Sequence, residues 1–210
     1  MRKLLLIGGG GHCKSVIDSV MGNDFYDAVG VVDFKDIYVS GVPVVGTDND
    51  LPQLYSNGWT NAFITVGSIG NTTTRRRLYK MVKQLGFFIP TIIDQSAMVA
   101  GNTTIEEGCY IGKRAVVNTG SSLGCCSIIN SGAIVEHECR IGDFSHISSG
   151  AILCGQVTIG NDSHVGAGTT IRQQIVIGDH VLVGIGSTVV KDISDDVKAY
   201  GNPCKVVKVR

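Results

Sequence analysis

The sequence predicts two parts: an α/β domain of Rossmann-like type over residues 1–90, and an all-β solenoid of parallel strands over residues 91–210. An apolar run followed by four consecutive glycines opens the chain, as at the first turn of a βαβ unit. From Ile93 to Val189 every sixth residue is aliphatic. A fixed short period is typical of a β-helix, whose repeats stack around one continuous core.

The α/β domain begins with an expected strand over residues 3–7, and glycines 8–11 separate it from a helix that starts near Cys13. A second strand over residues 28–32 ends at Asp33. Glycines before a helix leave backbone amides free to bind phosphate. The GxGxxG spacing is incomplete, because Cys13 stands in the third glycine position. A tight turn without a ligand is therefore the alternative interpretation.

The remaining elements place further loops at the same edge of the sheet. We expect a strand over residues 42–46, a helix over 50–57, a strand over 62–66 and a helix over 72–85. Ligands of such sheets bind beyond the carboxyl ends of the strands. Those ends carry residues 8–12, 33–35 and 67–71, so three loops converge there. The arginines from Arg75 to Arg77 either reach phosphate or, as the favoured interpretation, form a solvated helix face.

The bulk composition narrows the class of protein. The 210 residues carry a net charge of zero and no extended basic segment, which disfavours nucleic-acid binding. The longest apolar runs have the length of a strand, too short for a transmembrane helix. The seven cysteines lack CxxC metal spacing, and we expect them to be reduced thiols in small interior sites. We therefore expect a cytoplasmic protein without a metal. Residues 192–210 break the six-residue period and are expected to cap the solenoid.

The hexads resemble those of left-handed β-helix acyltransferases, and three local motifs narrow the resemblance. These motifs are Val135-Glu136-His137-Glu138-Cys139, residues 141–148, and Asp33-Phe34-Lys35. Over its whole length the chain resembles the bacterial hexapeptide-repeat sugar-nucleotide acetyltransferases, a group that includes enzymes described as sialic acid O-acetyltransferases. Within that group it is most similar to UDP-N-acetylbacillosamine and other UDP-4-amino-sugar N-acetyltransferases. The resemblance implies three hexads per coil, a homotrimer, and acyl-CoA bound between neighbouring helices.

The function implied by the resemblance is acetyl-CoA-dependent N-acetylation of a nucleotide-linked amino sugar for bacterial glycan biosynthesis. The expected acceptor is a UDP-linked 4-amino-4,6-dideoxy sugar, and His137 would be the general base. Histidine suits this role because it titrates near neutral pH. A neighbouring carboxylate would fix the tautomer of His137, with Glu138 as first choice and Glu136 as second. Adjacent residues on a straight strand point apart, so the contact requires a corner of the coil.

Counting by three hexads, the implied length of one coil, predicts which side chains stack. His146 should lie beside His164, and His137 should lie directly below Gly155. The Gly155 amide would then be open to donate to the oxyanion of a tetrahedral intermediate. The resemblance places His146 near the acetyl thioester. Small residues from Ala167 onward would let acetyl-CoA lie close. For His164, a side chain that is merely packed or solvated is as well supported as a functional role.

The resemblance also places the sugar nucleotide, rather than NAD, in the N-terminal domain. The implied substrate-binding residues are Gly10, Gly11, His12, Asp33, Lys35, Gly67 and Asn71. The first three would approach the diphosphate, and Asp33 and Lys35 would contact the base. A dehydrogenase is disfavoured, because about 90 residues cannot hold a complete dinucleotide fold together with a substrate site.

Two other functions and one other mechanism remain as alternatives. The chain could acetylate a hydroxyl of sialic acid, or it could be a non-catalytic solenoid scaffold that does not bind CoA. A covalent acyl-cysteine route would use Cys139 or Cys154. That route is disfavoured, because both fall at positions expected to pack inward or at corners of the coil.

Overall fold

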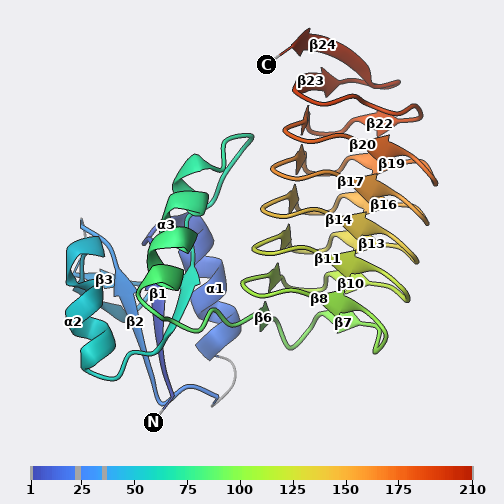
Figure 1. The fold of residues 1–210 in the computed structure, drawn as a ribbon. Coiled ribbons are helices and arrows are strands. Elements are labelled where there is room, and N and C mark those ends of the chain that lie inside the picture. The colour runs from blue at the N-terminus through green and yellow to red at the C-terminus, as the bar shows by residue number, and fades with distance from the viewer. Residues whose placement is uncertain (1, 22–24, 35–36, 210) are drawn as a thin grey trace. The chain divides into compact units, whose positions relative to one another are not determined.

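The computed structural model describes residues 2–21, 25–34 and 37–209 (Figure 1). The chain divides into two compact units. The first comprises Met1–Ser68 and Thr73–Ile92, and the second comprises Ile69–Thr72 and Ile93–Arg210. Among the described residues, no helix has both the length and the apolar character needed to cross a membrane.

The first unit is an α/β domain built on one five-stranded sheet, with strand order β3-β4-β2-β1-β5. Its elements are β1 (Lys3–Ile7), α1 (Gly11–Met21), β2 (Ala28–Val32), β3 (Tyr38–Val39), β4 (Val42–Gly46), the 3₁₀ helix η1 (Asp48–Asp50), α2 (Leu51–Ser56), β5 (Asn61–Ile64) and α3 (Thr73–Gln84). Strands β4, β2, β1 and β5 run parallel, and β3 pairs antiparallel with β4. The central strand β1 buries Leu4, Leu5 and Leu6 completely, as a strand covered on both faces must.

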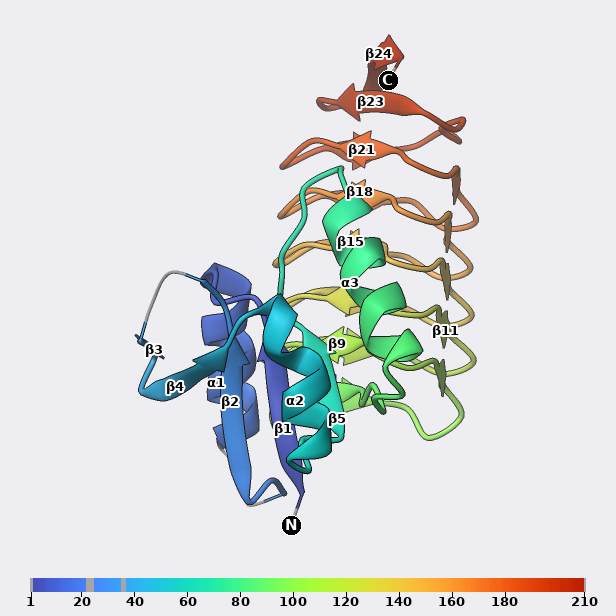
Figure 2. The same cartoon turned by 60° about the vertical axis from the view of Figure 1, so that its left-hand side comes forward.

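The second unit is a parallel β-helix in which strands β6 to β22 each span two residues. They are β6 (Ile92–Ile93), β7 (Met98–Val99), β8 (Thr104–Ile105), β9 (Tyr110–Ile111), β10 (Val116–Val117), β11 (Ser122–Leu123), β12 (Ile128–Ile129), β13 (Ile134–Val135), β14 (Arg140–Ile141), β15 (His146–Ile147), β16 (Ile152–Leu153), β17 (Thr158–Ile159), β18 (His164–Val165), β19 (Thr170–Ile171), β20 (Val176–Ile177), β21 (Leu182–Val183) and β22 (Thr188–Val189). Figure 2 shows β9, β15, β18 and β21 one above the other.

Three sheets form the sides of the coil, and from β6 to β19 each strand pairs with the third strand after it. We call them side 1 (β6, β9, β12, β15, β18, β21, β23, β24), side 2 (β7, β10, β13, β16, β19, β22) and side 3 (β8, β11, β14, β17, β20). The second residue of each strand points inward. From β9 to β22 these inward aliphatic residues are buried and form the core. The six-residue period of the sequence is thus the spacing of the three sides.

The corners of the coil carry a second regular feature. One residue at many corners has a positive φ between 55° and 73°, and these residues include the non-glycine residues Glu138, Phe144, Gln156 and Gln174. The left-handed backbone conformation lets the chain turn sharply from one side to the next. Strands β23 (Val197–Tyr200) and β24 (Lys205–Val209) then form an antiparallel pair that continues side 1 beyond the last coils.

Candidate active site

His137 and Glu138 occupy the corner between β13 and β14. Glu138 has a φ of 58°, so the chain turns between these residues and their side chains meet. Nδ1 of His137 lies 3.2 Å from Oε2 of Glu138. The corner that the contact requires is therefore present. With Nδ1 donating to the carboxylate, Nε2 is the ring nitrogen left to accept a proton.

Glu138 has a second partner that the sequence reasoning missed. Its Oε2 also accepts a hydrogen bond from Nε2 of Gln156 at 3.1 Å. These hydrogen bonds, first that of His137 and then that of Gln156, lower the pKa of Glu138. Glu136, the second choice as partner of His137, instead accepts from Nδ2 of Asn118 at 3.0 Å. The geometry therefore favours Glu138. Counting one coil on from Glu138 reaches Gln156, but it is the left-handed corner at both residues that directs their side chains the same way.

Gly155 lies directly above His137, as counting by three hexads predicts. The amide of Gln156 donates to the carbonyl of His137 at 2.9 Å. A Cβ on Gly155 would lie only 2.5 Å from Cε1 of His137, so the imidazole fills the space of a side chain at 155. The expectation of an open glycine is wrong in this respect, because Gly155 is buried. Contact of its amide with an oxyanion stays a prediction.

His146 and His164 stack as expected, with Cα atoms in register on β15 and β18. Their rings meet edge to face with centroids 4.8 Å apart. Nε2 of His164 lies 3.2 Å from Oγ of Ser148, and burial lowers the pKa of His164 to about 4. The side chain of His164 is therefore packed rather than solvated. Nε2 of His146 lies 3.2 Å from Nδ2 of Asn130.

Of the predicted acetyl-CoA residues, only Gly155 lies at the His137 corner of one chain, whereas His146 and Ala167 lie elsewhere. His137 lies where side 2 meets side 3, whereas His146 lies on side 1. In a triangular coil that corner is opposite side 1. Ala167 is exposed at a different corner, between β18 and β19. A single solenoid therefore presents His137 and His146 in opposite directions.

The glycine loop of the first unit is open where a ligand would approach. A Cβ on Gly10 or Gly11 would meet nothing within 4 Å, and α1 begins at Gly11, two residues before the expected start. Gly8 has a φ of 104° and packs against Val66, which explains why only glycine suits that position. Backbone amides at the start of a helix such as α1 suit a phosphate group.

Asp33 holds this loop in place. Its Oδ2 accepts from the amide of Gly9 at 2.6 Å, and its Oδ1 accepts from the amide of Phe34 at 2.7 Å. A carboxylate offers about four acceptor sites, so contact with a base stays compatible with these bonds. Lys35, the other predicted base contact, lies outside the described residues.

A cavity of about 380 Å³ opens beside Asp33, at the carboxyl ends of β1 and β2. The loop 47–49 and the first turns of α3 line its other walls. Arg77 and Asp48 both border it, and Nη2 of Arg77 lies 3.2 Å from Oδ2 of Asp48. Sequence reasoning missed Asp48, although it lies two residues after β4, close to the strand end as Asp33 is directly after β2.

The solvated arginine face predicted for α3 is wrong for Arg75, which is only 2% exposed. Burial, and then the charge of Arg75, lower the pKa of His12 to about 4. His12 is therefore a neutral imidazole at pH 7. Gly67 is exposed beside His12 in the first unit, whereas Asn71 belongs to the second unit. There, Oγ1 of Thr72 donates to Oδ1 of Asp162.

Comparison with known proteins identifies the same two parts. The model for the PglD N-terminal domain matches residues 3–82, and the model for bacterial transferase hexapeptide repeats matches residues 138–173. PerB from Caulobacter crescentus, solved with CoA and GDP-perosamine, is 34% identical with a TM-score of 0.91 over 99% of this chain and 98% of its own. The acetyltransferase domain of PglB from Neisseria gonorrhoeae, solved with acetyl coenzyme A, is 36% identical with a TM-score of 0.92, covering 98% and 99%.

The chain belongs to the hexapeptide-repeat sugar-nucleotide acetyltransferases. It is an acyltransferase, and the predicted fold class, a Rossmann-like α/β domain followed by a left-handed β-helix, is confirmed. WeeI from Acinetobacter baumannii is 20% identical with a TM-score of 0.82 over 99% of this chain and 100% of its own, and it shares the fold.

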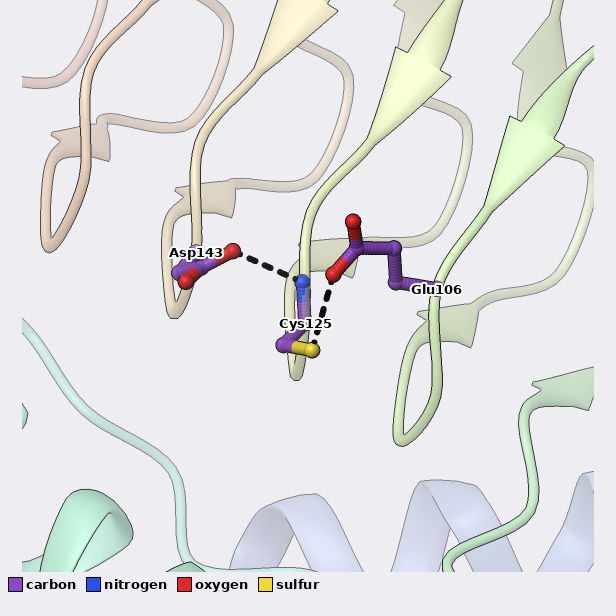
Figure 3. A group of neighbouring side chains, drawn as sticks. All are labelled: Glu106, Cys125 and Asp143. Carbon is purple, nitrogen blue, oxygen red and sulfur yellow. Dashed lines mark hydrogen bonds between the residues drawn. The ribbon is translucent and has the colours of Figure 1, made fainter.

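In this acetyltransferase one further group of side chains has the composition of a metal site. Glu106, Cys125 and Asp143 lie together at one corner of the solenoid (Figure 3). Oδ1 of Asp143 accepts from the amide of Cys125, and Asn161 accepts from the amide of Asp143 in the same way, at 2.9 and 2.8 Å. Asp143 thus belongs to a repeated capping pattern of the coil. That pattern accounts for the cluster, which carries no metal assignment.

Cys139 is unsuited to a covalent acyl-cysteine route. It is fully buried, and its Sγ donates to the carbonyl of Cys154 at 3.3 Å. Burial raises the pKa of Cys139 to about 11, so its thiolate is scarce at neutral pH. The arrangement at the His137 corner instead suits direct attack by a deprotonated nucleophile.

Proposed function

We propose that this enzyme transfers the acetyl group of acetyl-CoA to the amino group of a nucleotide-linked amino sugar. The observation that carries the proposal is the His137–Glu138 pair, with Nδ1 and Oε2 3.2 Å apart and Nε2 left as proton acceptor. Supporting it, PerB is solved with CoA and GDP-perosamine, and PglB with acetyl coenzyme A. Variants of PerB with one histidine replaced by Asn or Ala are also known in complex with these ligands.

In the proposed reaction the amine nitrogen attacks the thioester carbon directly. The new N–C bond forms as Nε2 of His137 takes the amine proton. Collapse of the tetrahedral intermediate breaks the C–S bond, and the sulfur leaves as CoA thiol after it gains the proton that Nε2 of His137 took from the amine. The Glu138 carboxylate keeps the proton on Nδ1 and stabilises the imidazolium that forms at Nε2. His146 and the Gly155 amide are the proposed contacts of the acetyl group.

The first unit is the proposed site of the nucleotide. The amides of Gly10, Gly11 and His12 would receive the diphosphate, and the cavity beside Asp33 would receive the base. Gly67 and Asn71 are the proposed sugar or phosphate contacts. We propose a 4-amino-4,6-dideoxy sugar linked to UDP, and the GDP-sugar bound by PerB makes GDP the main rival nucleotide. Thermal shift with UDP-, dTDP-, GDP- and CMP-sugars distinguishes them, because the ligand that binds the native state raises the melting temperature.

The arrangement of the histidines supports a homotrimer with active sites between subunits. His137 and His146 point in opposite directions from one solenoid. Both can contact one acetyl group only if each comes from a different copy of the chain. A closed ring of identical subunits brings the corner of one copy to side 1 of the next.

The decisive experiment for the proposed reaction is His137→Ala. We expect kcat for N-acetylation to fall by about 100-fold or more, because a positioned general base contributes about 10²–10⁴-fold. CoA release with an amino-sugar nucleotide as acceptor measures the rate. Near wild-type turnover by His137→Ala would refute the role of His137. Turnover with sialic acid or CMP-sialic acid in place of the amino sugar would favour O-acetylation, and no thermal shift with acetyl-CoA would favour a scaffold.

A further inference from the structure

Three polar residues occupy the same corner position on successive coils: Glu138, Gln156 and Gln174. Each follows the previous one by a full coil, and their φ angles are 58°, 63° and 63°. Because the backbone conformation is the same at each, the three side chains leave the coil in the same direction. They form a column on the solenoid surface, which we call the corner column.

The hydrogen bonds of the corner column run in one direction. Nε2 of Gln174 donates to Oε1 of Gln156 at 2.9 Å, and Nε2 of Gln156 donates to Oε2 of Glu138 at 3.1 Å. A glutamine amide has one accepting and one donating end. Since Gln174 occupies the accepting end of Gln156, the donating end points at Glu138. The Oε2 atom that receives it is the one that faces Nδ1 of His137.

Glu138 needs such a restraint. Its side chain is 59% exposed, and an exposed glutamate loses rotamer entropy when it is held in one place. From below, Gly120 leaves room for the stem, since a Cβ there would lie 3.3 Å from Cγ of Glu138. Among the described residues, His137 and Gln156 are the only side chains that hydrogen-bond the carboxylate. Gln156 therefore fixes it from above.

We propose that Gln156, oriented by Gln174, is a positioning residue that holds the Glu138 carboxylate on Nδ1 of His137. The inference rests on the proposed role of His137 as general base. Gln156 need not touch the substrate, because it acts through Glu138. When the carboxylate is held, Nδ1 keeps its proton and Nε2 faces the amine as the base. When it is released, the imidazole spends more time in the unproductive tautomer.

A double-mutant cycle tests the proposal. Gln156→Met keeps the length of the side chain but removes the donor. In the wild-type background we expect kcat to fall about 3- to 10-fold with KM within about twofold, the range for loss of one ordinary intramolecular hydrogen bond, because Gln156 acts on the base only through Glu138. In a Glu138→Ala background, Gln156 has no carboxylate to hold. There we expect the same substitution to change kcat by less than about 1.5-fold, because coupled residues are not additive.

Gln174→Met and Gln53→Met complete the design. Gln174→Met should lower kcat in the same direction by a smaller factor, since Gln174 acts one step further away. Gln53 is exposed on α2, and its conversion to Met is the matched control expected to leave kcat unchanged. An equal fall in both backgrounds, or no fall in the wild-type background, would overturn the positioning role. Full activity of His137→Ala would instead overturn the proposed role of His137 as general base, and no turnover of any amino-sugar nucleotide by the wild-type enzyme would overturn the proposed function, so these failures are distinguishable.

Discussion

The candidate general base depends on a residue that has no side chain. The imidazole of His137 lies in the space that any Cβ on Gly155 would occupy. Gly155 has no positive φ, so the requirement for glycine there comes from the ring and not from the backbone. This separates two reasons for glycine at a solenoid corner, conformational freedom and close packing.

Gly155→Ala should therefore lower kcat by about 10- to 100-fold, because displacement of a catalytic group by about 1 Å costs rates of that order. The stability of the solenoid should change little. Gly101 occupies the equivalent corner two coils before His137, and a Cβ there would meet nothing within 4 Å. Gly101→Ala is thus the matched control, and steady-state kinetics of both variants decide the matter. Equal activity of the two would show that the ring tolerates the methyl group.

At this scale the sequence predicted contacts that depend on the coil length and missed those that depend on the corner conformation. The pairing of His146 with His164 follows from counting by one coil, and the structure confirms it. Gln156 on Glu138 requires the left-handed corner to be known, which residue types alone do not indicate. Arg75 was missed because three adjacent arginines look solvated, although a helix points successive residues in different directions.

Among the elements, the strand pair β15 and β18 is unusual because polar, titratable side chains are packed on it. Its outward positions hold two histidines whose rings touch, and His164 is only 7% exposed. The neighbouring strand β21 has Leu182 at the same register position. The His164 ring is thus buried beside the position of an apolar side chain. Such surroundings favour the neutral form of the imidazole over the charged form.

This element makes stability depend on pH. Burial lowers the pKa of His164 from 6.5 to about 4, so between these values the unfolded chain binds the proton and the folded chain does not. Stability that is present at pH 7 should be lost as the pH falls from 6.5 towards 4, by about 3 kcal/mol. His164→Leu should show a smaller loss over this range. Thermal unfolding of both proteins from pH 7 to pH 4 measures the difference, and parallel curves would contradict it.

The boundaries of the strands and helices show which elements the periodicity of the sequence predicts. The strands of the solenoid fall where the aliphatic hexads place them, because each hexad supplies one strand and one corner. The helix expected over residues 50–57 is a 3₁₀ turn, Asp48–Asp50, followed by α2. Thr47 is the N-cap residue of that turn, and its hydroxyl and amide both donate to Oδ2 of Asp50, at 2.9 and 2.8 Å. The ends of short helical elements that depend on such local contacts are weakly coded in the sequence.

For the whole molecule, the separation of His137 and His146 is the informative feature. They are one and a half hexads apart, which is half a coil, so they lie on opposite sides of the axis. This arithmetic was available from the sequence once the coil was known to hold three hexads. What the sequence could not supply is the way copies of the chain meet, since that depends on whole surfaces.

The proposed trimer makes a testable prediction about mixed assemblies. His137→Ala and His146→Ala should each be inactive or nearly so. If each site takes one histidine from each of two chains, co-expression of the two variants restores about a quarter of the sites, because subunits mix at random. Light scattering should give a mass three times that of the 22.2 kDa chain. Absence of recovered activity in a confirmed mixed trimer would place both histidines on one chain.

The register of the strands in successive coils also limits how this chain can change in length. An insertion of three hexads above the His137 corner would add one whole turn and return every later side chain to its own side. An insertion of a single hexad would move every later residue by one side of the triangle, carrying His146 from side 1 to side 2. Insertions or deletions that keep His137 and His146 on their present sides of the coil must therefore comprise whole turns.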